Sequence, residues 1–400
     1  MARAVIVDAI RSPMAKGKAT GALAGVHPVD LLGQLLAAIV ARNGLDPAAV
    51  DDVVIGCVDQ NGEQSATPGR QALLSAGFPT SVPSMTIERK CGSGQQAIDV
   101  AAWGIGAGVY DVAIAGGVES MSRVPMGSNR MGADAFGPRV RARFPDLVPQ
   151  GLSAELVARK WSLTREQLDS YSAESHRRAD VARGNGGFLD EIVAISVPDS
   201  DRTFDTDETI RPGSTVESLG SLKPAFASDQ NRARFPDLDF MITAGNASQI
   251  TDGASVLLLM SEQQAAALGL RPRARIVASA VCGDDPTLML TGPIPATRKV
   301  LERAKMKLDD IDGVEINEAF ASVPLAWAAE FDIDPAKVNP RGGAIALGHP
   351  LGASGARLMT TLIHHLEQTG GRYGLQTMCE AGGMANATII EILDRAPQNG

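Results

Sequence analysis

The chain has 400 residues, with 37 basic and 46 acidic side chains and a formal net charge of −9. This balance gives no overall attraction to nucleic acid or to anionic lipid. Three Tyr and three Trp are also too few for a base-stacking surface. A hydrophobic fraction of 44% supports a folded core and excludes collagen-like and mostly disordered classes.

The first residues lack a secretory signal, because the apolar run at residues 4–7 stops at Asp8. No apolar stretch approaches the length of a membrane span. We therefore expect a cytoplasmic protein without membrane insertion, in a compartment where cysteines stay reduced. The four cysteines are Cys57, Cys91, Cys282 and Cys379. Their spacing matches no zinc-binding pattern, and we predict no metal site.

Short apolar strands alternate with amphipathic helices in the first third of the chain. We expect strands at 4–7, 53–55 and 112–115 and helices at 29–41 and 95–105. Such alternation is typical of an α/β domain.

The sequence also repeats itself at long range. Matching segments recur at one constant separation: 51–56 with 312–317, and Ser93-Gly94 with Ser354-Gly355. Each Ser-Gly pair opens a predicted helix, and the strand that follows that helix ends in a pair of glycines. We interpret this pattern as the duplication of one α/β unit.

Residues 121–245 differ from both copies, because they combine Arg- and Asp-rich irregular stretches with helices expected at 153–161 and 165–183. We interpret them as an insertion lying over one face of the duplicated unit. The predicted division is a first half of residues 1–120 and 246–268, an inserted domain of residues 121–245, and a second half of residues 269–400.

Cys91 stands at a glycine-rich turn before a predicted helix, in the segment Glu88-Arg-Lys-Cys-Gly-Ser-Gly. Unpaired N–H groups at a helix N-terminus favour a thiolate, and so do the neighbouring cations Arg89 and Lys90. The alternative is a structural cysteine, since free Cys is commonly buried. The glycine-rich turn favours the reactive interpretation.

Three further segments place reactive side chains at turns or strand ends. His349 lies among five glycines, which suits a base that must reach a substrate, although a hydrogen-bonded structural His is the common alternative. Asn317 and Glu318 follow a buried strand, where ligands gather in α/β sheets, or they cap a helix expected at 319–330. Cys379 ends another strand, and a second thiol near the first would serve as a proton donor.

Six motifs, in order, resemble the thiolase family of acyl-CoA acyltransferases. They are Cys91-Gly-Ser-Gly, Gly116-Gly-Val-Glu-Ser-Met-Ser, Thr243-Ala-Gly-Asn-Ala-Ser, Asn317-Glu-Ala-Phe-Ala, Gly348-His-Pro-Leu-Gly-Ala-Ser-Gly and Cys379-x-x-Gly-Gly. The resemblance implies an α/β fold of two similar halves in five layers, αβαβα, with an inserted loop domain. It also implies a homodimer or homotetramer that binds coenzyme A and a 3-ketoacyl-CoA, with CoA as co-substrate and no other cofactor.

Carried over to this sequence, the resemblance assigns roles to four side chains. Cys91 resembles the nucleophile that becomes acylated, and His349 resembles the residue that activates it and lines an oxyanion site. Asn317 resembles the residue that holds a water in that site, and Cys379 the acid/base that acts on the acetyl-CoA methyl group. The backbone N–H groups of Cys91 and Ala381 are expected to form a second oxyanion site. The positions expected to line the pantetheine channel are Phe226, Ser248, Ala319 and Phe320.

The resemblance implies cleavage of a 3-ketoacyl-CoA by CoA into acetyl-CoA and a shortened acyl-CoA, through an acyl-Cys intermediate. Three positions depart from the family pattern. Glu88 replaces a frequent Asn, and Ala381 replaces a frequent Gly. Gln150 stands close to the acyl group where short-chain members often have Met. The change at Gln150 favours bulkier acyl chains, as in fatty-acid or steroid breakdown.

Five arginines between residues 121 and 150 are candidates for binding CoA phosphates, or they form a solvated surface. They are Arg123, Arg130, Arg139, Arg141 and Arg143.

Other functions stay open. One is an acetyl-CoA acetyltransferase that forms acetoacetyl-CoA, and another is a non-catalytic acyl-CoA-binding homologue. Ketoacyl synthases and hydroxymethylglutaryl-CoA synthases generally use His or Asn where this chain has Cys379. The chain has neither the GxGxxG nor the GxxxxGK[ST] spacing, which disfavours dinucleotide-dependent oxidoreductases and nucleotide hydrolases.

Overall fold

The computed structural model describes residues 3–198 and 202–393, so the ends of the two predicted halves, 1–2 and 394–400, lie outside the described residues. Five strands of the first half lie side by side: β1 (Ala4–Arg11), β3 (Asp52–Gly56), β4 (Ser84–Ile87), β5 (Val112–Ser120) and β8 (Thr251–Ser261). Four strands belong to the second half: β9 (Ala274–Gly283), β10 (Gly313–Ile316), β11 (Tyr373–Glu380) and β12 (Met384–Ile392).

These strands join in the order β10-β11-β12-β9-β1-β8-β5-β3-β4, and the short β2 (Ala15–Lys16) pairs with β8. The halves meet where β1 pairs with β9, through only two pairs of residues. Within the first half β1, β8 and β5 are antiparallel neighbours and β5 is parallel to β3. The second half repeats this scheme with β9, β12, β11 and β10. The duplication inferred from the sequence is therefore visible in the sheet.

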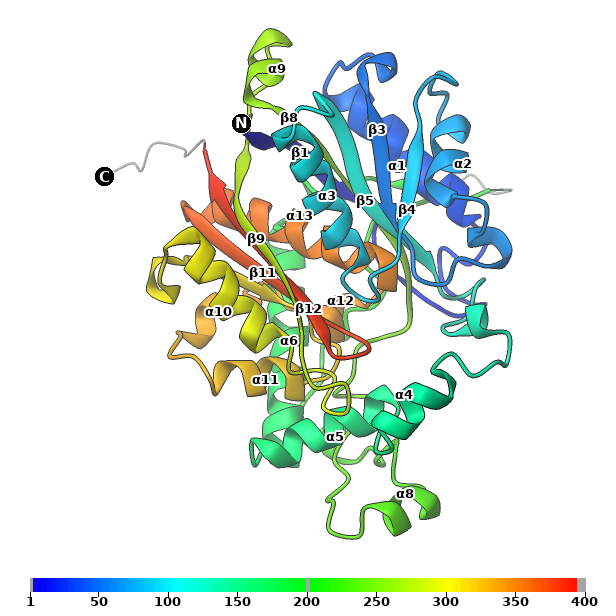
Figure 1. Cartoon of the computed structure of the whole chain (residues 1–400), viewed down its shortest axis with the longest axis vertical. Helices are drawn as coiled ribbons and strands as arrows, with labels where there is room; N and C mark the ends of the chain where they lie inside the picture. Colours follow the sequence, from blue (N-terminus) through cyan, green and yellow to red (C-terminus); the bar gives the residue numbers. More distant parts are fainter. Residues whose placement is uncertain (1–2, 199–201, 394–400) are drawn as a thin grey trace.

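Helices form three layers around the two halves of the sheet (Figure 1). The outer helices of the first half are α1 (Pro28–Arg42) and α2 (Pro68–Ser75), and those of the second half are α10 (Pro293–Ala304) and α11 (Ser322–Ala328). Between the halves lie α3 (Ser93–Gly106) and α13 (Leu351–Thr369), which pack against each other and against strands. The five-layer αβαβα class is thus confirmed.

The burial of each helix follows from its layer. In α1 the buried side chains lie on one face, as expected of a helix that covers an outer face of a sheet. In α13 every residue from Leu351 to His364 is buried, because strands of both halves pack around it. The central layer therefore carries polar groups such as His349 and Ser354 into the interior, at the start of α13.

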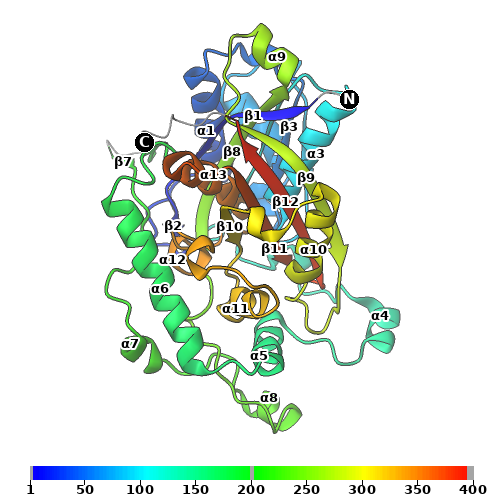
Figure 2. The ribbon, with the colours of Figure 1, turned by 90° about the vertical axis from the view of Figure 1, so that its left-hand side faces the viewer.

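The segment between β5 and β8 covers one end of the molecule and runs along one side of it (Figure 2). It contains α4 (Gly137–Arg143), α5 (Gln150–Lys160), α6 (Arg165–Gly184), β6 (Ile195–Ser196), β7 (Thr203–Phe204), α7 (Val216–Gly220) and α8 (Asp229–Arg234). The apolar side chains of α5 share a core with α11 and the strands of the second half. The boundaries at 120/121, 245/246 and 268/269 stay a prediction.

Shorter elements complete the described chain: the helices α9 (Glu262–Ala267) and α12 (Ala344–Leu347), and the 3₁₀ turns Pro47–Ala49, Gly62–Gln64, Ser128–Arg130, Leu308–Asp310 and Pro335–Lys337. Within residues 3–198 and 202–393, none of the helices combines the length and the apolar character needed to cross a membrane.

The helix expected at 319–330 is wrong at its start, because α11 begins only at Ser322. Residues 319–321 instead bond to the chain at 246–248. The Ser248 N–H donates to the Ala319 carbonyl at 3.0 Å, and the Ala321 N–H donates to the Asn246 carbonyl at 2.9 Å. This tertiary pairing uses backbone groups at 319 and 321, so the helix begins only after the segment, although two of its three residues are Ala.

Candidate active site

Cys91 lies at the turn between β4 and α3, directly before the helix cap Gly92. Its side chain is buried, with 5% exposure. The backbone N–H groups of Cys91 and Ala381 lie near its sulfur and act to lower its pKa. Ala381 follows β11, so the turn of the first half and a strand end of the second half meet at this thiol.

Cys379 is fully buried near the end of β11. It interacts electrostatically with Cys91 and forms a hydrogen bond with the side chain of Asn317. The two thiols are distant in sequence, and the fold brings them into one neighbourhood.

His349 is held by two side chains at the start of α13. Its Nδ1 lies 2.5 Å from the Ser354 hydroxyl, which itself donates to the Pro350 carbonyl at 2.9 Å. Because the hydroxyl proton is used there, Nδ1 carries the ring proton and donates to Ser354. The Asn317 amide nitrogen lies 3.4 Å from Nε2, which is the unprotonated ring nitrogen. Nε2 is therefore the atom of His349 that can accept a proton.

Burial, with a smaller contribution from the charge of Arg357, lowers the pKa of His349 to about 3. The imidazole is thus neutral in the resting protein at physiological pH. A neutral ring with a free Nε2 has the state that a general base requires.

The thiols behave differently from the expectation for a helix N-terminus. Burial raises the pKa of Cys91 to about 12, and the charge of Glu380 adds to this rise. The two N–H groups and Lys90 oppose the rise without cancelling it. Burial also raises the pKa of Cys379 well above that of a free thiol, and ionisation of Cys91 raises it further. At Cys91 the N–H groups and Lys90 act in the predicted direction, toward the thiolate, but desolvation outweighs them.

Asn317 and Glu318 do not cap a helix, because α11 starts four residues later without a side-chain cap. Glu318 accepts hydrogen bonds from Tyr171, Ser175 and Asn339 and from the backbone N–H of Ile345. It therefore ties α6 and the loop before α12 to the strand end that carries Asn317.

Two small cavities reach the candidate residues. One of about 170 Å³ is lined by His349, Ser248, Ala319, Phe320 and Gln150. The other, of about 120 Å³, is lined by Cys91, Ala381 and again Gln150. Met126 and Leu351 also line both, so the two cavities adjoin. Phe226 lines neither of them but packs edge-on against Phe320, with 6.4 Å between ring centroids.

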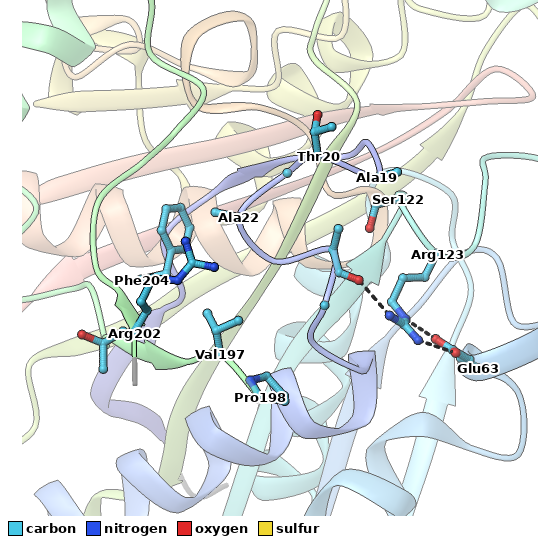
Figure 3. Close-up of a pocket in the computed structure, with 14 residues that line it drawn as sticks. Ala19, Thr20, Ala22, Glu63, Ser122, Arg123, Val197, Pro198, Arg202 and Phe204 are labelled. Atoms are coloured by element: carbon cyan, nitrogen blue, oxygen red, sulfur yellow. Dashed lines mark hydrogen bonds and ion pairs between the residues drawn. The ribbon is translucent and has the colours of Figure 1, made fainter. Parts of the chain in front are cut away.

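The five candidate arginines do not form one cluster. Arg123 lies in a separate open pocket of about 780 Å³, where it pairs with Glu63 and donates to the Ala24 carbonyl (Figure 3). Arg141 pairs with Asp134. Only Arg130 lines the cavity that contains Cys91. Their role in binding phosphate stays a prediction.

Sequence reasoning assigned no role to Ser354 or Glu119. The buried Glu119 carboxylate accepts bonds from the N–H groups of Val58, Asp59 and Gly352, and so fixes the loop after β3 against the first turn of α13. The sequence feature that could have indicated Glu119 is an acidic residue near the end of the apolar strand β5. Among the described residues no group of three or more His, Cys, Asp or Glu side chains is arranged to hold a metal ion.

Two family profiles match the chain: "Thiolase, N-terminal domain" over residues 4–263 and "Thiolase, C-terminal domain" over residues 270–392. The chain belongs to the thiolase family. It is therefore an acyltransferase.

Named relatives agree with this assignment. The chain is 48% identical to a steroid 3-ketoacyl-CoA thiolase, FadA6, of Mycobacterium tuberculosis, over 98% of this chain and 95% of that protein. It is 43% identical to a 3-ketoacyl-CoA thiolase of Pectobacterium carotovorum, over 98% of this chain and 100% of the relative. The crystal structure of an acetyl-CoA acetyltransferase from Bacillus anthracis superposes with a TM-score of 0.87 at 40% identity, covering 98% and 99% of the two chains.

Proposed function

We propose that this thiolase cleaves a 3-ketoacyl-CoA with CoA, with Cys91 as nucleophile, in fatty-acid or steroid degradation. The observation that carries the proposal is that Cys91 and a neutral His349 line adjoining cavities, with the buried Cys379 and Asn317 next to them. A pocket that only bound acyl-CoA would have no use for a second thiol beside the first.

In the first step Nε2 of His349 takes the proton of Cys91, and the sulfur attacks the keto carbon. The carbonyl oxygen becomes an oxyanion, and the new N–H of His349 can donate to it. Asn317 supports this site, because its amide nitrogen faces Nε2 and its buried Oδ1 has no protein partner among the described residues. That oxygen is available to accept a bond from a water or from substrate.

The carbon–carbon bond then breaks, and its electron pair passes to the enolate of acetyl-CoA. Cys379 gives this carbon its proton, which leaves an acyl thioester on Cys91. CoA enters, loses its thiol proton to Cys379, and attacks the thioester carbonyl. The bond to Cys91 breaks, and the departing sulfur recovers its proton from His349. The raised pKa of Cys379 suits the second transfer, because a thiol that holds its proton tightly is a strong base once ionised.

We propose that residues 121–245 cover this site, because Met126 and Gln150 line both cavities. The amide of Gln150 stands between the His349 side and the Cys91 side, where the acyl group must pass. The relatives' names cover steroid and unspecified 3-ketoacyl substrates. We propose that the substrate of this protein carries a bulky acyl chain. We also propose that the protein forms a homo-oligomer and is located in the cytoplasm.

The decisive experiment follows acylation of Cys91. Incubation with a 3-ketoacyl-CoA in the absence of CoA should leave an acyl group on the peptide containing Cys91, read by mass spectrometry. The Cys91→Ala variant should lose thiolysis by at least about a thousandfold, since removing a nucleophile removes the covalent route. Cys57→Ala, a buried thiol outside the two cavities, is the matched control. Normal turnover by Cys91→Ala would exclude this mechanism.

A panel of substrates tests the acyl specificity. We expect CoA-dependent loss of long-chain or steroid 3-ketoacyl-CoA to be faster than that of acetoacetyl-CoA. The reverse order would favour the acetoacetyl-CoA-forming acetyltransferase.

A further inference from the structure

The carboxyl group of Glu380 lies against Gly92, the residue that follows the candidate nucleophile Cys91. Gly92, which follows Cys91, has φ −84° and ψ 3°, a conformation open to any residue. Its backbone therefore does not require glycine. A Cβ at this position would lie 2.1 Å from Oε1 of Glu380. The missing side chain of Gly92 makes room for the carboxyl group.

Glu380 is fully buried, and neither of its carboxylate oxygens has a hydrogen-bond partner among the described residues. Buried carboxylates normally accept several bonds. The facing cation, Arg89, lies 4.0 Å away from Oε2, and its side chain is 31% exposed. Burial raises the pKa of Glu380 to about 8, because Arg89 compensates only in part. The group therefore changes its charge at mildly alkaline pH.

Glu380 also connects the elements of the site. It lies between Cys379 and Ala381, whose N–H lies near the sulfur of Cys91. Its charge raises the pKa of Cys91, Cys379 and the β9 residue Cys282. Other charged or titratable groups near Glu380 or Cys91 come from the turn and from α3: Glu88, Arg89, Lys90 and Asp99. Asp59 and Arg130 line the cavity that contains Cys91.

Building on the proposed role of Cys91, we propose that the carboxylate of Glu380, once ionised at alkaline pH, keeps the resting nucleophile in its thiol form. The ionised carboxylate opposes a second negative charge beside it. The thiolate then forms only when His349 removes the proton in the presence of substrate. At alkaline pH the resting enzyme is thereby protected from foreign electrophiles.

The alkylation rate of Cys91 by iodoacetamide, followed by peptide mapping from pH 6 to pH 10, tests the proposal. Only the thiolate reacts, so the logarithm of the rate rises by one for each pH unit when the pKa of the thiol is constant. For the unmodified protein we expect the plot of the logarithm of the rate against pH to flatten near pH 8, where Glu380 ionises. At higher pH the plot should rise again with its earlier slope. In Glu380→Gln we expect a straight line that coincides with the unmodified protein below pH 7. Above pH 9 the variant should react about tenfold faster, since one pKa unit changes the thiolate fraction tenfold.

A structural effect of the substitution would shift the rate equally at every pH. Glu380→Asp keeps the carboxyl group and should keep the flattened profile. Glu391→Gln, at the other end of the β11–β12 pair, should behave like the unmodified protein. A straight plot of log rate against pH for the unmodified protein would overturn the proposal. Parallel plots for the unmodified protein and Glu380→Gln would overturn it as well. Failure of the proposed function is a separate result, because the acyl group would then be absent from Cys91 whatever the alkylation profiles show.

Discussion

At the scale of single residues, the site is a chain of contacts from Ser354 through His349 and Asn317 to Cys379. Each of these residues fixes the protonation or the position of its neighbour. Ser354 places the ring proton of His349 on Nδ1, and Asn317 holds the opposite nitrogen and the second thiol. Burial keeps the imidazole neutral and both thiols protonated. In the proposed mechanism the resting site therefore holds one base and two acids, which is what a two-stage acyl transfer needs.

Cys379→Ala should separate proton transfer, which we assign to Cys379, from nucleophilic attack, which we assign to Cys91. We expect exchange of solvent deuterium into the methyl group of acetyl-CoA to fall by about 10²–10⁴, the usual contribution of a general acid or base. Acyl transfer to Cys91 should be kept at least in part, because the nucleophile and His349 remain. Cys282→Ala, the half-buried thiol on β9, is the control and should exchange normally. Undiminished exchange in Cys379→Ala would contradict the assigned role.

At the scale of elements, the walls of the site depend on helix α5 and on an aromatic pair. Gly151 follows Gln150 in α5, and a Cβ on it would lie 2.0 Å from the ring of Phe226. That ring packs against Phe320, which lines the cavity beside His349. The position of α5 is thus coupled to the width of the cavity.

Gly151→Ala should therefore displace Phe226 and narrow the cavity. Overpacking costs about 1–3 kcal/mol, and we expect kcat/KM for a bulky 3-ketoacyl-CoA to fall about tenfold, which corresponds to about 1.4 kcal/mol. Acetoacetyl-CoA should be affected less. Gly184→Ala is the control, because a Cβ there meets no atom within 4 Å. Equal losses for both substrates would show that the acyl channel does not depend on this contact.

At the scale of the whole molecule, a buried ion network joins the inserted segment to the central sheet. Arg11 on β1 is fully buried and donates to Asp207 at 2.7 and 2.9 Å and to Glu191 at 2.6 Å. Both carboxylates belong to residues 121–245. The segment proposed to cover the site is thereby anchored to the first strand of the chain.

Asp207→Asn should destabilise the protein by about 3–5 kcal/mol, because it leaves a buried guanidinium without one of its charges. The midpoint of guanidinium-induced unfolding, followed by circular dichroism, measures this loss. Asp134→Asn, which breaks the exposed pair with Arg141, should hardly move the midpoint. An equal midpoint for Asp207→Asn and the unmodified protein would show that the network does not anchor the segment.

The sequence by itself determined the α/β class, the duplication and the residues that meet at the site. Local patterns carried this information: apolar periodicity placed α1 within one residue at each end, and the matched segments revealed the repeat. The sequence did not predict where α11 begins or the charge state of Cys91. Backbone pairing with residues 246–248 delays the helix, and burial beside Glu380 holds the thiol protonated. Both depend on groups distant in the chain, so only the tertiary structure decided them.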